Sequence, residues 1–306
     1  MQLANTILMV RPASFSYNEE TAATNYFQKN IPIPNTELQQ KALKEFDDMV
    51  ALLRSNEVNV IVIDDTTEPK KPDAVFPNNW LSVDHKGIVD VFPMHALSRR
   101  NEKRDDILQL LTKQFNITDV VDWSEYEADA LYLEGTGSMV MDHQNKIIYA
   151  CLSARTSKSL VEKFASTKGY RALTFTAHDL DGNNIYHTNV MMCVGEGFSI
   201  LCPKAITDDD ERIAVAQLLE TTGHENIYIT QEQMKSFAGN VLHIKNKSGQ
   251  RLIVLSKTAH DSLLENQKQR LESYGKLLPI DVGIIEQVEG GSVRCMMTEI
   301  FAEPNN

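Results

Sequence analysis

Short apolar runs, each followed by a polar, helix-forming segment, recur along the chain. The runs are typical of buried strands, and the segments after them carry apolar residues at helical spacing. Four copies occupy residues 87–111, 147–165, 198–219 and 251–271. The spacings between copies, measured from Val91 through Ala150 and Leu201 to Val254, are 59, 51 and 53 residues. Recurrence at such a period indicates a repeat architecture in which each repeat is one supersecondary unit.

In the three later copies, a further apolar run precedes the strand across a short polar turn. The sequences are SMVMD-HQN-KIIYAC, VMMCV-GE-GFSILC and VLHI-KNKSG-QRLIVL. Two apolar runs joined in this way predict a β-hairpin. A partial fifth unit combines an amphipathic segment near residues 36–55 with the apolar run at residues 59–65. We therefore predict one α/β domain over residues 1–306, in which the strand ends of distant units meet near a common axis.

The charge balance excludes several classes of function. Thirty Lys and Arg stand against forty-two Asp and Glu, for a net charge of −12. This excess of acid opposes binding to nucleic acid and to anionic membranes, because both need clustered cations. No apolar run reaches the roughly 18 residues that span a bilayer, and the N-terminal residues lack a signal-peptide pattern. We expect a cytoplasmic protein that acts on a small molecule.

The four cysteines are scattered and form neither a CxxC pair nor any other metal-ligand spacing, so we expect reduced thiols and no metal. Three of them, Cys151, Cys193 and Cys202, lie in strand-like runs and are interpreted as small core residues. Cys295 differs because it follows a Gly-Gly turn and stands beside Arg294, whose charge would favour the thiolate. A core role is the alternative for Cys295 as well.

Polar residues interrupt the apolar pattern in further segments, each of which we expect at the end of a strand. In PDAVFPNNW, Asp73 stands near the adjacent amides Asn78 and Asn79, and the alternative is a plain turn, because Pro-Asn-Asn favours turns. In LYLEGTGSMV, Glu134 follows an apolar strand, where a carboxylate is costly unless it is paired. Glu134 is either part of a buried salt bridge or a carboxylate that orients a catalytic group.

A histidine and three arginines complete the candidates. His187 and Asn189 lie two apart in NIYHTNVMMCV, so on a strand both face the same side. His187 is either a base or a core histidine. Arg155 in CLSARTS and the pair Arg99 and Arg100 in HALSRRNEK stand at equivalent turns of two repeats. Arginine pairs with carboxylates through two parallel hydrogen bonds, so these are candidate anchors for an acidic ligand group, with a solvated surface role as the alternative.

Together these side chains supply the parts of a covalent hydrolase. A thiol attacks, an imidazole moves protons, a carboxylate orients the imidazole, and guanidinium groups hold an acidic end of the substrate. Such a set suits attack on an sp² carbon that bears nitrogen leaving groups. No cofactor is needed for this chemistry.

The order of the segments resembles the guanidino-group-modifying enzymes, the superfamily of arginine deiminase and dimethylarginine dimethylaminohydrolase. The matching pieces are RP at residues 11–12, DAVFPNN, SRRNE, LEG, LSART, HTN, AGNVL at residues 238–242, and GGSVRCMM. They cover residues 11–301, and the chain looks most like the bacterial citrulline-utilisation hydrolases. The resemblance implies a pentein α/β propeller, which is a ring of five ββαβ units around a pseudo-fivefold axis.

The resemblance also implies roles for single residues. Cys295 matches the nucleophile, His187 the general acid and base, and Glu134 the acid that orients the histidine. Among the substrate-binding positions, Arg99 and Arg155 match the arginines that hold the substrate carboxylate, and Asp73 matches the aspartate at its amino-acid end. The superfamily often forms homodimers. Three matters stay open: whether Arg99 or Arg100 faces the site, what Arg11 does, and whether Asn240 lines the site.

Three amides replace acids that relatives use to hold a guanidinium. Arginine deiminases have Asp at the positions of Asn79 and Asn189, and the dimethylarginine enzymes have an acid at the position of Asn78. GTG also stands where GGD is usual. Amides both donate and accept hydrogen bonds without charge, whereas carboxylates beside a neutral ureido group would be buried and uncompensated. The three amides therefore favour a ureido substrate.

We predict a cysteine hydrolase that converts citrulline to ornithine, ammonia and carbon dioxide. N-succinylarginine dihydrolase, a relative, handles a guanidinium with amide side chains, so the first alternative is a hydrolase of arginine or a substituted arginine. The second alternative, from another class, is a catalytically silent pentein that only binds its ligand.

Overall fold

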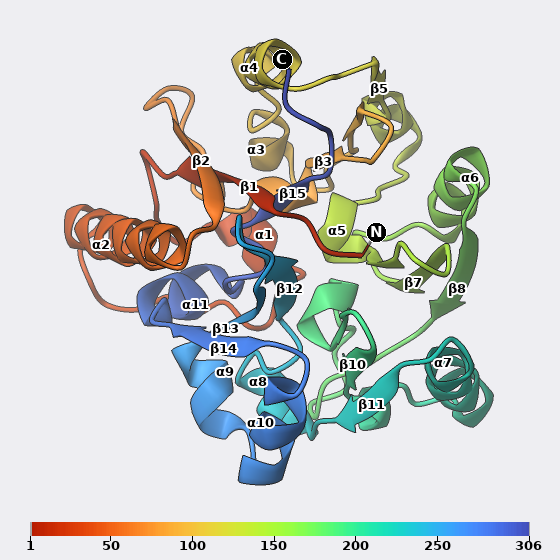
Figure 1. Cartoon of the computed structure of the whole chain (residues 1–306). Helices are drawn as coiled ribbons and strands as arrows, with labels where there is room; N and C mark the ends of the chain where they lie inside the picture. Colours follow the sequence, from red (N-terminus) through yellow and green to blue (C-terminus); the bar gives the residue numbers. More distant parts are fainter. Residues whose placement is uncertain (1, 306) are drawn as a thin grey trace.

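Residues 2–305 are described by a computed structural model. Fifteen strands in this range form one three-stranded pattern five times. The middle strand of each triplet pairs antiparallel with one neighbour and parallel with the other. In Figure 1 the five triplets lie around a common centre, with the long helices outside them.

Each triplet is written here with its antiparallel partner first and its parallel partner last. The triplets are β15 (Thr298–Ile300), β1 (Thr6–Arg11) and β2 (Asn59–Asp64); β3 (Leu81–Val83), β4 (Ile88–Val91) and β5 (Asp119–Asp122); β6 (Val140–Asp142), β7 (Ile147–Cys151) and β8 (Arg171–Phe175); β9 (Met192–Val194), β10 (Phe198–Leu201) and β11 (Glu225–Tyr228); β12 (Leu242–Lys245), β13 (Arg251–Ser256) and β14 (Lys276–Ile280). The first triplet combines strands from both ends of the chain, so β15 closes the arrangement. A pair between Ile300 and Val83 joins β15 to β3 and merges two triplets into a six-stranded sheet.

Helical crossovers join the middle strand of each triplet to its parallel partner, as parallel pairing requires. They contain α1 (Glu19–Ala22) and α2 (Asn35–Ser55); α3 (Leu97–Arg100) and α4 (Asp105–Gln114); α6 (Lys158–Lys168); η4 (Pro203–Ala205) and α7 (Asp209–Thr221); α9 (Lys257–Ser262) and α10 (Glu265–Glu272). The other helices are η1 (Pro77–Asn79), η2 (Ser124–Asp129), α5 (Gly135–Ser138), η3 (Thr188–Val190), α8 (Gln231–Lys235) and α11 (Gly283–Glu289). None of the helices in residues 2–305 has the length and apolar character to cross a membrane.

Helix α2 shows why these segments fold as they do. Its buried residues recur at helical spacing and include Phe46 and Leu53, which pack in one cluster with Ile7 of β1. Burying one side chain of this size contributes roughly 1.5–3 kcal/mol. Helix α7 begins where the side chain of Asp208 accepts a hydrogen bond from the backbone N–H of Glu211 at 2.9 Å, which caps the helix N-terminus.

The pattern-based predictions hold for the repeats and fail for most of the polar segments. The three hairpins are confirmed as β6–β7, β9–β10 and β12–β13, and the helix near residues 36–55 is confirmed as α2. The expectation that polar segments end strands is wrong for the segments of Asn79, Glu134 and His187. These residues come before β3, β6 and β9. His187 directly precedes η3 and Asn189 lies within it, so the two do not share a strand face.

Candidate active site

Five short turns, one before the first strand of each triplet, carry most of the candidate residues, and three of them are the helices η1, α5 and η3. The turns hold, in chain order, Asn78 and Asn79; Glu134; His187 and Asn189; Asn240; and Cys295. A helical hydrogen bond closes each turn: Trp80 N to Pro77 O, Gly137 N to Glu134 O, Val190 N to His187 O, Asn240 N to Phe237 O, and Cys295 N to Ser292 O. Because the triplets surround one centre, the repeat brings five chemically different turns together.

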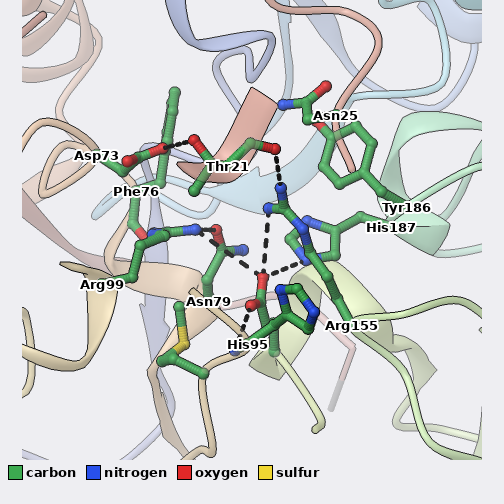
Figure 2. A network of polar contacts seen from close by, with 12 residues as sticks. Thr21, Asn25, Asp73, Phe76, Asn79, His95, Arg99, Arg155, Tyr186 and His187 are labelled. Carbon is green, nitrogen blue, oxygen red and sulfur yellow. Dashed lines mark hydrogen bonds and ion pairs between the residues drawn. The ribbon is translucent and has the colours of Figure 1, made fainter. Parts of the chain in front are cut away.

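Glu134 is the centre of a buried network of donors. Its Oε2 lies 2.8 Å from Nε2 of His187, 3.6 Å from Nη1 of Arg155 and 4.0 Å from Nη1 of Arg99. Its Oε1 accepts the backbone N–H of His95 at 3.0 Å. Figure 2 shows His187, Arg155 and Arg99 converging on this point from different sides. The structure therefore brings together four residues that the sequence analysis singled out.

Charge and burial determine the protonation states of Glu134 and His187. Burial raises the pKa of Glu134, but Arg155, His187 and Arg99 more than offset it, so this pKa lies well below its ordinary value. Burial lowers the pKa of His187 to about 4, although the hydrogen bond to Glu134 opposes that change. At neutral pH the site thus holds an ionised carboxylate and a neutral imidazole, which is able to accept a proton.

Gly137 is needed beside this imidazole. A Cβ atom at residue 137 would lie 2.7 Å from Nδ1 of His187 and 2.5 Å from Nδ2 of Asn79. Only glycine permits such an approach without displacing both side chains. The Gly-Thr-Gly segment that departs from the family pattern therefore retains the glycine that packs against the histidine.

The Cys295 thiol lies between two side-chain amides. Nδ2 of Asn240 is 3.3 Å from Sγ and Nδ2 of Asn189 is 3.5 Å from it. Asn240 also accepts the backbone N–H of Arg294 at 3.0 Å, which fixes the turn that carries Cys295. Asn240 therefore lines the site, and Asn189 contacts the thiol.

Arg294 does not have the place that the sequence suggested. Its guanidinium donates to Met297 O at 2.9 Å and to Glu299 at 3.1 Å, so its charge is paired with a carboxylate. The other three thiols differ from Cys295 in their surroundings. Burial raises the pKa of Cys151 and Cys193 to about 12 and that of Cys202 to about 11, which disfavours their thiolates.

The arginines separate into buried and peripheral ones. Arg99 is 2% exposed, forms a bidentate pair with Glu102 at 2.8 Å, and donates to Asn79 Oδ1 at 2.7 Å. Arg155 donates to Thr21 O at 2.7 Å and to Thr24 Oγ1 at 2.9 Å. Arg99 rather than its neighbour thus faces the site, and both buried guanidinium groups are already bonded to protein atoms.

Two arginines lie away from these contacts. Arg100 pairs with Glu127 at 3.2 Å and donates to Met94 O. Arg11, at the end of β1, forms a bidentate pair with Asp47 of α2 at 2.8 Å. Arg11 therefore ties a strand to its crossover helix.

Residues 18–28 cover the site and were not singled out from the sequence. Asn18 Nδ2 donates to Asp73 at 2.5 Å, Asn25 donates to Glu289 O at 3.0 Å, and Gln28 Nε2 donates to Glu289 Oε2 at 3.1 Å. In Figure 2, Thr21 lies beside Asp73, and Asn25 lies beyond the guanidinium of Arg155. Glu289 and Gln28 were missed because neither belongs to a motif, although Glu289 directly precedes the Gly-Gly turn before Cys295.

The site is closed in this structure. Cys295 and His187 are 2% and 1% exposed. A cavity of about 270 Å³ is lined by Tyr26, Phe27 and Phe237 rather than by the catalytic candidates. A much smaller cavity, of about 30 Å³, is lined in part by Asn189. Phe27 packs against Tyr186, which in turn contacts the ring of His187. Within residues 2–305, no group of three or more His, Cys, Asp and Glu residues is arranged to hold a metal ion.

A thiol beside amides, an imidazole bound to a carboxylate, and buried guanidinium groups are the parts of a covalent C–N hydrolase. The family described as N,N dimethylarginine dimethylhydrolase, eukaryotic, matches residues 11–302. The chain therefore belongs to this family of guanidino-group hydrolases, which act on C–N bonds. No curated protein sequence matches the chain significantly.

Solved structures share the fold at low sequence identity. The N-terminal domain of ArgZ, an arginine dihydrolase from Cyanobacteria, is 16% identical over 97% of this chain and 98% of that domain, with a TM-score of 0.75. The chain covers 41% of the longer ArgZ protein. A dimethylarginine dimethylaminohydrolase is 14% identical over 98% of this chain and all of that chain, with a TM-score of 0.67. These likenesses concern the fold.

Proposed function

We propose that the chain is a cysteine hydrolase of a guanidino-bearing amino acid, with arginine or a substituted arginine as substrate. The observation that carries this proposal is the charge of the buried cluster. Four carboxyl groups, those of Asp73, Glu102, Glu134 and Glu289, interact there with the guanidinium groups of Arg99 and Arg155. Acids outnumber cations two to one in a site that excludes water.

Such an excess favours a cationic ligand. Burial raises the pKa of Glu102 to about 7 and that of Glu289 well above its ordinary value. A cationic ligand would allow such protonated carboxyl groups to ionise beside it. Arginine carries one positive charge more than citrulline. The findings of family and fold agree, because the named relatives include an arginine dihydrolase and a dimethylarginine hydrolase. This moves our first choice from the ureido substrate to the guanidino substrate.

The chemistry begins with proton transfer from the Cys295 thiol to the neutral imidazole of His187. The thiolate attacks the guanidino carbon, and the imidazolium returns the proton to the departing nitrogen, which leaves as ammonia or an alkylamine. His187 then takes a proton from water, which attacks the covalent thiouronium and releases a ureido product and the thiol. Glu134 stabilises the imidazolium in both halves of the reaction.

Hydrolysis of citrulline is the second candidate, and the amides favour it. Asn78, Asn79 and Asn189 stand where acids hold a guanidinium in relatives, and Asn79 Nδ2 lies close to His187 across Gly137. Amides suit a neutral ureido group. The same thiol could then take the first product further, since citrulline and water balance to ornithine, ammonia and carbon dioxide. A silent binding protein has less support, because the thiol, imidazole and carboxylate are all present.

The arrangement of strands supports the finer description of the fold as well. Five triplets of one pattern around one centre agree with a five-bladed α/β propeller of ββαβ units, in which the last strand β15 completes the first unit. In this architecture Asp73, Arg99 and Arg155 hold the amino-acid end of the substrate while the five turns surround its reacting carbon.

The test is ammonia release from L-arginine, dimethylarginine and citrulline at equal concentration, with citrulline and ornithine quantified in parallel. Turnover of a guanidino substrate by the wild type, but not by Cys295→Ser, supports the proposal. Ornithine from citrulline alone, with no turnover of either guanidino compound, would reverse the order of the two candidates. No turnover of any of the three compounds would contradict both.

A further inference from the structure

A cavity where the second and third triplets meet β15, here called the β15 cavity, lies outside the candidate active site. Its volume is about 130 Å³, and its lining includes residues of β3, β4, β6, α6 and β15. Cys295, His187 and Glu134 do not line it. It borders the site through Thr136 of α5, which lines the cavity and whose hydroxyl accepts a hydrogen bond from Asn78 Nδ2 at 3.2 Å.

Aromatic rings form much of the wall of the β15 cavity. The rings of His85 and His143 lie 4.2 Å and 4.8 Å from the ring of Phe301, measured between centroids. Nδ1 of His143 lies 2.8 Å from the hydroxyl of Tyr170, and all four side chains line the cavity. An apolar cavity of about 150 Å³ is large enough to bind benzene. The β15 cavity therefore has the size and the lining for one six-membered aromatic ring.

The acids of the lining have cations beside them. Lys168, which also lines the cavity, forms ion pairs with Asp90 at 2.6 Å and with Asp84 at 3.3 Å. Glu299 forms an ion pair with Arg294 at 3.1 Å. These carboxylates therefore do not call for a cationic ligand.

Two exposed lysines of the lining are not paired with an acid. Among the described residues, neither Lys86 nor Lys146 forms an ion pair. Lys146 Nζ lies 4.6 Å from the centroid of the Tyr170 ring, which places its charge at the aromatic wall. Hydrogen bonds from an ammonium to a carboxylate are among the stronger ones in proteins. The exposed end of the cavity therefore favours an anionic group.

A buried hydroxyl of the lining lacks a partner. Thr298 of β15 is 2% exposed, and within the described part of the chain its Oγ1 has no hydrogen-bond partner. Buried polar atoms are rarely left unpaired in native proteins, so this hydroxyl indicates a polar group on a ligand. The cavity thus combines a buried hydrogen-bonding group, aromatic walls and exposed cations.

We propose that the β15 cavity binds a single-ring aromatic carboxylate with a hydroxyl group opposite the carboxylate. The hydroxyl bonds to Thr298, and the carboxylate pairs with Lys86 and Lys146. This is a second small-molecule site, and it goes beyond the proposed function. Its ligand lies against Thr136, two residues after Glu134 in the chain, and so contacts a turn of the candidate active site from outside.

Calorimetry with 4-hydroxybenzoate and benzoate on the wild-type chain tests the proposal. We expect 4-hydroxybenzoate to bind with a Kd below about 1 mM, which is within reach of a ligand of this size. Benzoate should bind about 3- to 10-fold more weakly, because it leaves the Thr298 hydroxyl unpaired. Thr298→Val should remove this difference, and retained binding of benzoate would show that the variant is folded.

Lysine variants test the exposed end of the cavity. Changing Lys86 and Lys146 together to Gln should weaken the binding of both acids about 3- to 10-fold, as expected for two exposed ion pairs. Binding of the neutral analogue 4-hydroxybenzyl alcohol should not change. Lys163→Gln is the matched control, because Lys163 also lies over a tyrosine ring, that of Tyr126, but does not line the cavity.

Alkylation of Cys295 by iodoacetamide separates the β15 cavity from the active site. The alkylated protein should bind 4-hydroxybenzoate as tightly as the untreated protein, and a loss of affinity would place the ligand at the thiol and overturn the inference. No binding of either acid at about 10 mM would also overturn it. So would a preference for 4-hydroxybenzoate that survived Thr298→Val. Binding is measured without turnover, so the proposed function is judged separately.

Discussion

Two buried glutamates in one cluster show opposite ways to place an acid in a protein interior. Glu134 is 0% exposed and has four donors within 4.0 Å, while Glu289 is 1% exposed and has one donor, the amide of Gln28. Burial raises the pKa of both groups. Cations bring the pKa of Glu134 back below its ordinary value, whereas the nearby Asp73 adds to the rise at Glu289.

The two regions differ in how the protein stabilises a buried carboxyl group. Around Glu134 the protein supplies every partner, so the imidazole is oriented before substrate arrives. Around Glu289 burial and the neighbouring Asp73 favour the protonated carboxyl group, so protonation rather than a paired cation stabilises this acid.

Cys295→Ser should abolish turnover, with a loss of at least about 10⁴-fold in kcat, because the nucleophile acts as a unit with the groups around Glu134. Ammonia release measures this loss, and circular dichroism should show an intact fold. Cys193→Ala is the control, since this thiol lies in β9 and has a raised pKa. A Cys295→Ser protein that kept activity, or a Cys193→Ala protein that lost it, would contradict the assignment.

Glu134→Gln should cost about 3–5 kcal/mol of unfolding free energy, because Arg155 and Arg99 would then share one acceptor fewer in a dry site. Glu289→Gln should not destabilise the fold at neutral pH, since a neutral amide replaces an acid without a cation. Urea unfolding of both variants at pH 7 gives the comparison directly. Equal destabilisation by the two changes would show that the contrast between the regions is wrong.

The two regions should also respond to pH in opposite directions. The raised pKa of Glu289 means that the folded state holds its proton more tightly than the unfolded chain, so this group's contribution to stability is lost as pH rises above its ordinary value of 4.5. The lowered pKa of His187 means that the unfolded chain takes up a proton first, so its contribution is lost as pH falls from 6.5 towards 4.

Unfolding free energies measured from pH 4 to 8 test this opposition. Relative to wild type, Glu289→Gln should gain stability as pH rises above 4.5, by up to about 1.4 kcal/mol per pH unit. His187→Gln should gain relative stability as pH falls below 6.5. If the unfolding free energies of the wild type and a variant changed in parallel with pH, the pKa shift of the residue replaced in that variant would be contradicted.

Most of the difference between the surroundings of Glu134 and Glu289 could not be predicted from the sequence. Hydrophobic periodicity predicted the repeats and the three hairpins, because those strands are apolar on both faces. It did not reveal strands such as β5, whose residues Asp119–Asp122 are largely exposed. The turns before β3, β6 and β9 were mistaken for strand ends, because a single helical turn is too short to show a period.

The candidate catalytic residues were easier to predict than the acidic cluster of Glu289 and Asp73. Cys295, His187 and Glu134 stand out because a thiol, an imidazole and a carboxylate have distinctive chemistry and recognisable neighbours in the sequence. Glu289 looks like any acid at a helix end. Its surroundings come from Gln28 and Asp73, which lie more than two hundred positions away in the sequence.

Asn79→Asp should move specificity towards a guanidinium by about 10-fold in the ratio of kcat/KM for arginine to that for citrulline. The added carboxylate keeps the hydrogen bond from Arg99 at 2.7 Å but adds to the excess of acids in the site, which a cationic substrate offsets and a neutral one does not. Competition assays with both substrates measure the ratio. The same shift from Glu289→Gln would be unexpected, because Glu289 lies beside Asp73, at the amino-acid end that arginine and citrulline share, so that variant is the control.

The smallest effect concerns the amides on sulfur. Asn189 donates to Cys295 at 3.5 Å, and its own Oδ1 has no hydrogen-bond partner. Asn189→Ala therefore removes one donor to the sulfur without leaving another buried polar group unpaired. Alkylation of Cys295 by iodoacetamide should slow about 3-fold, as expected for a weak hydrogen bond to a thiolate. Asn240→Ala should slow it more, because Asn240 lies closer and also holds the Arg294 backbone. If Asn189→Ala instead left alkylation unchanged and raised KM for citrulline alone, Asn189 would belong to substrate recognition, as the sequence first suggested, and Asn240 alone would serve the thiol.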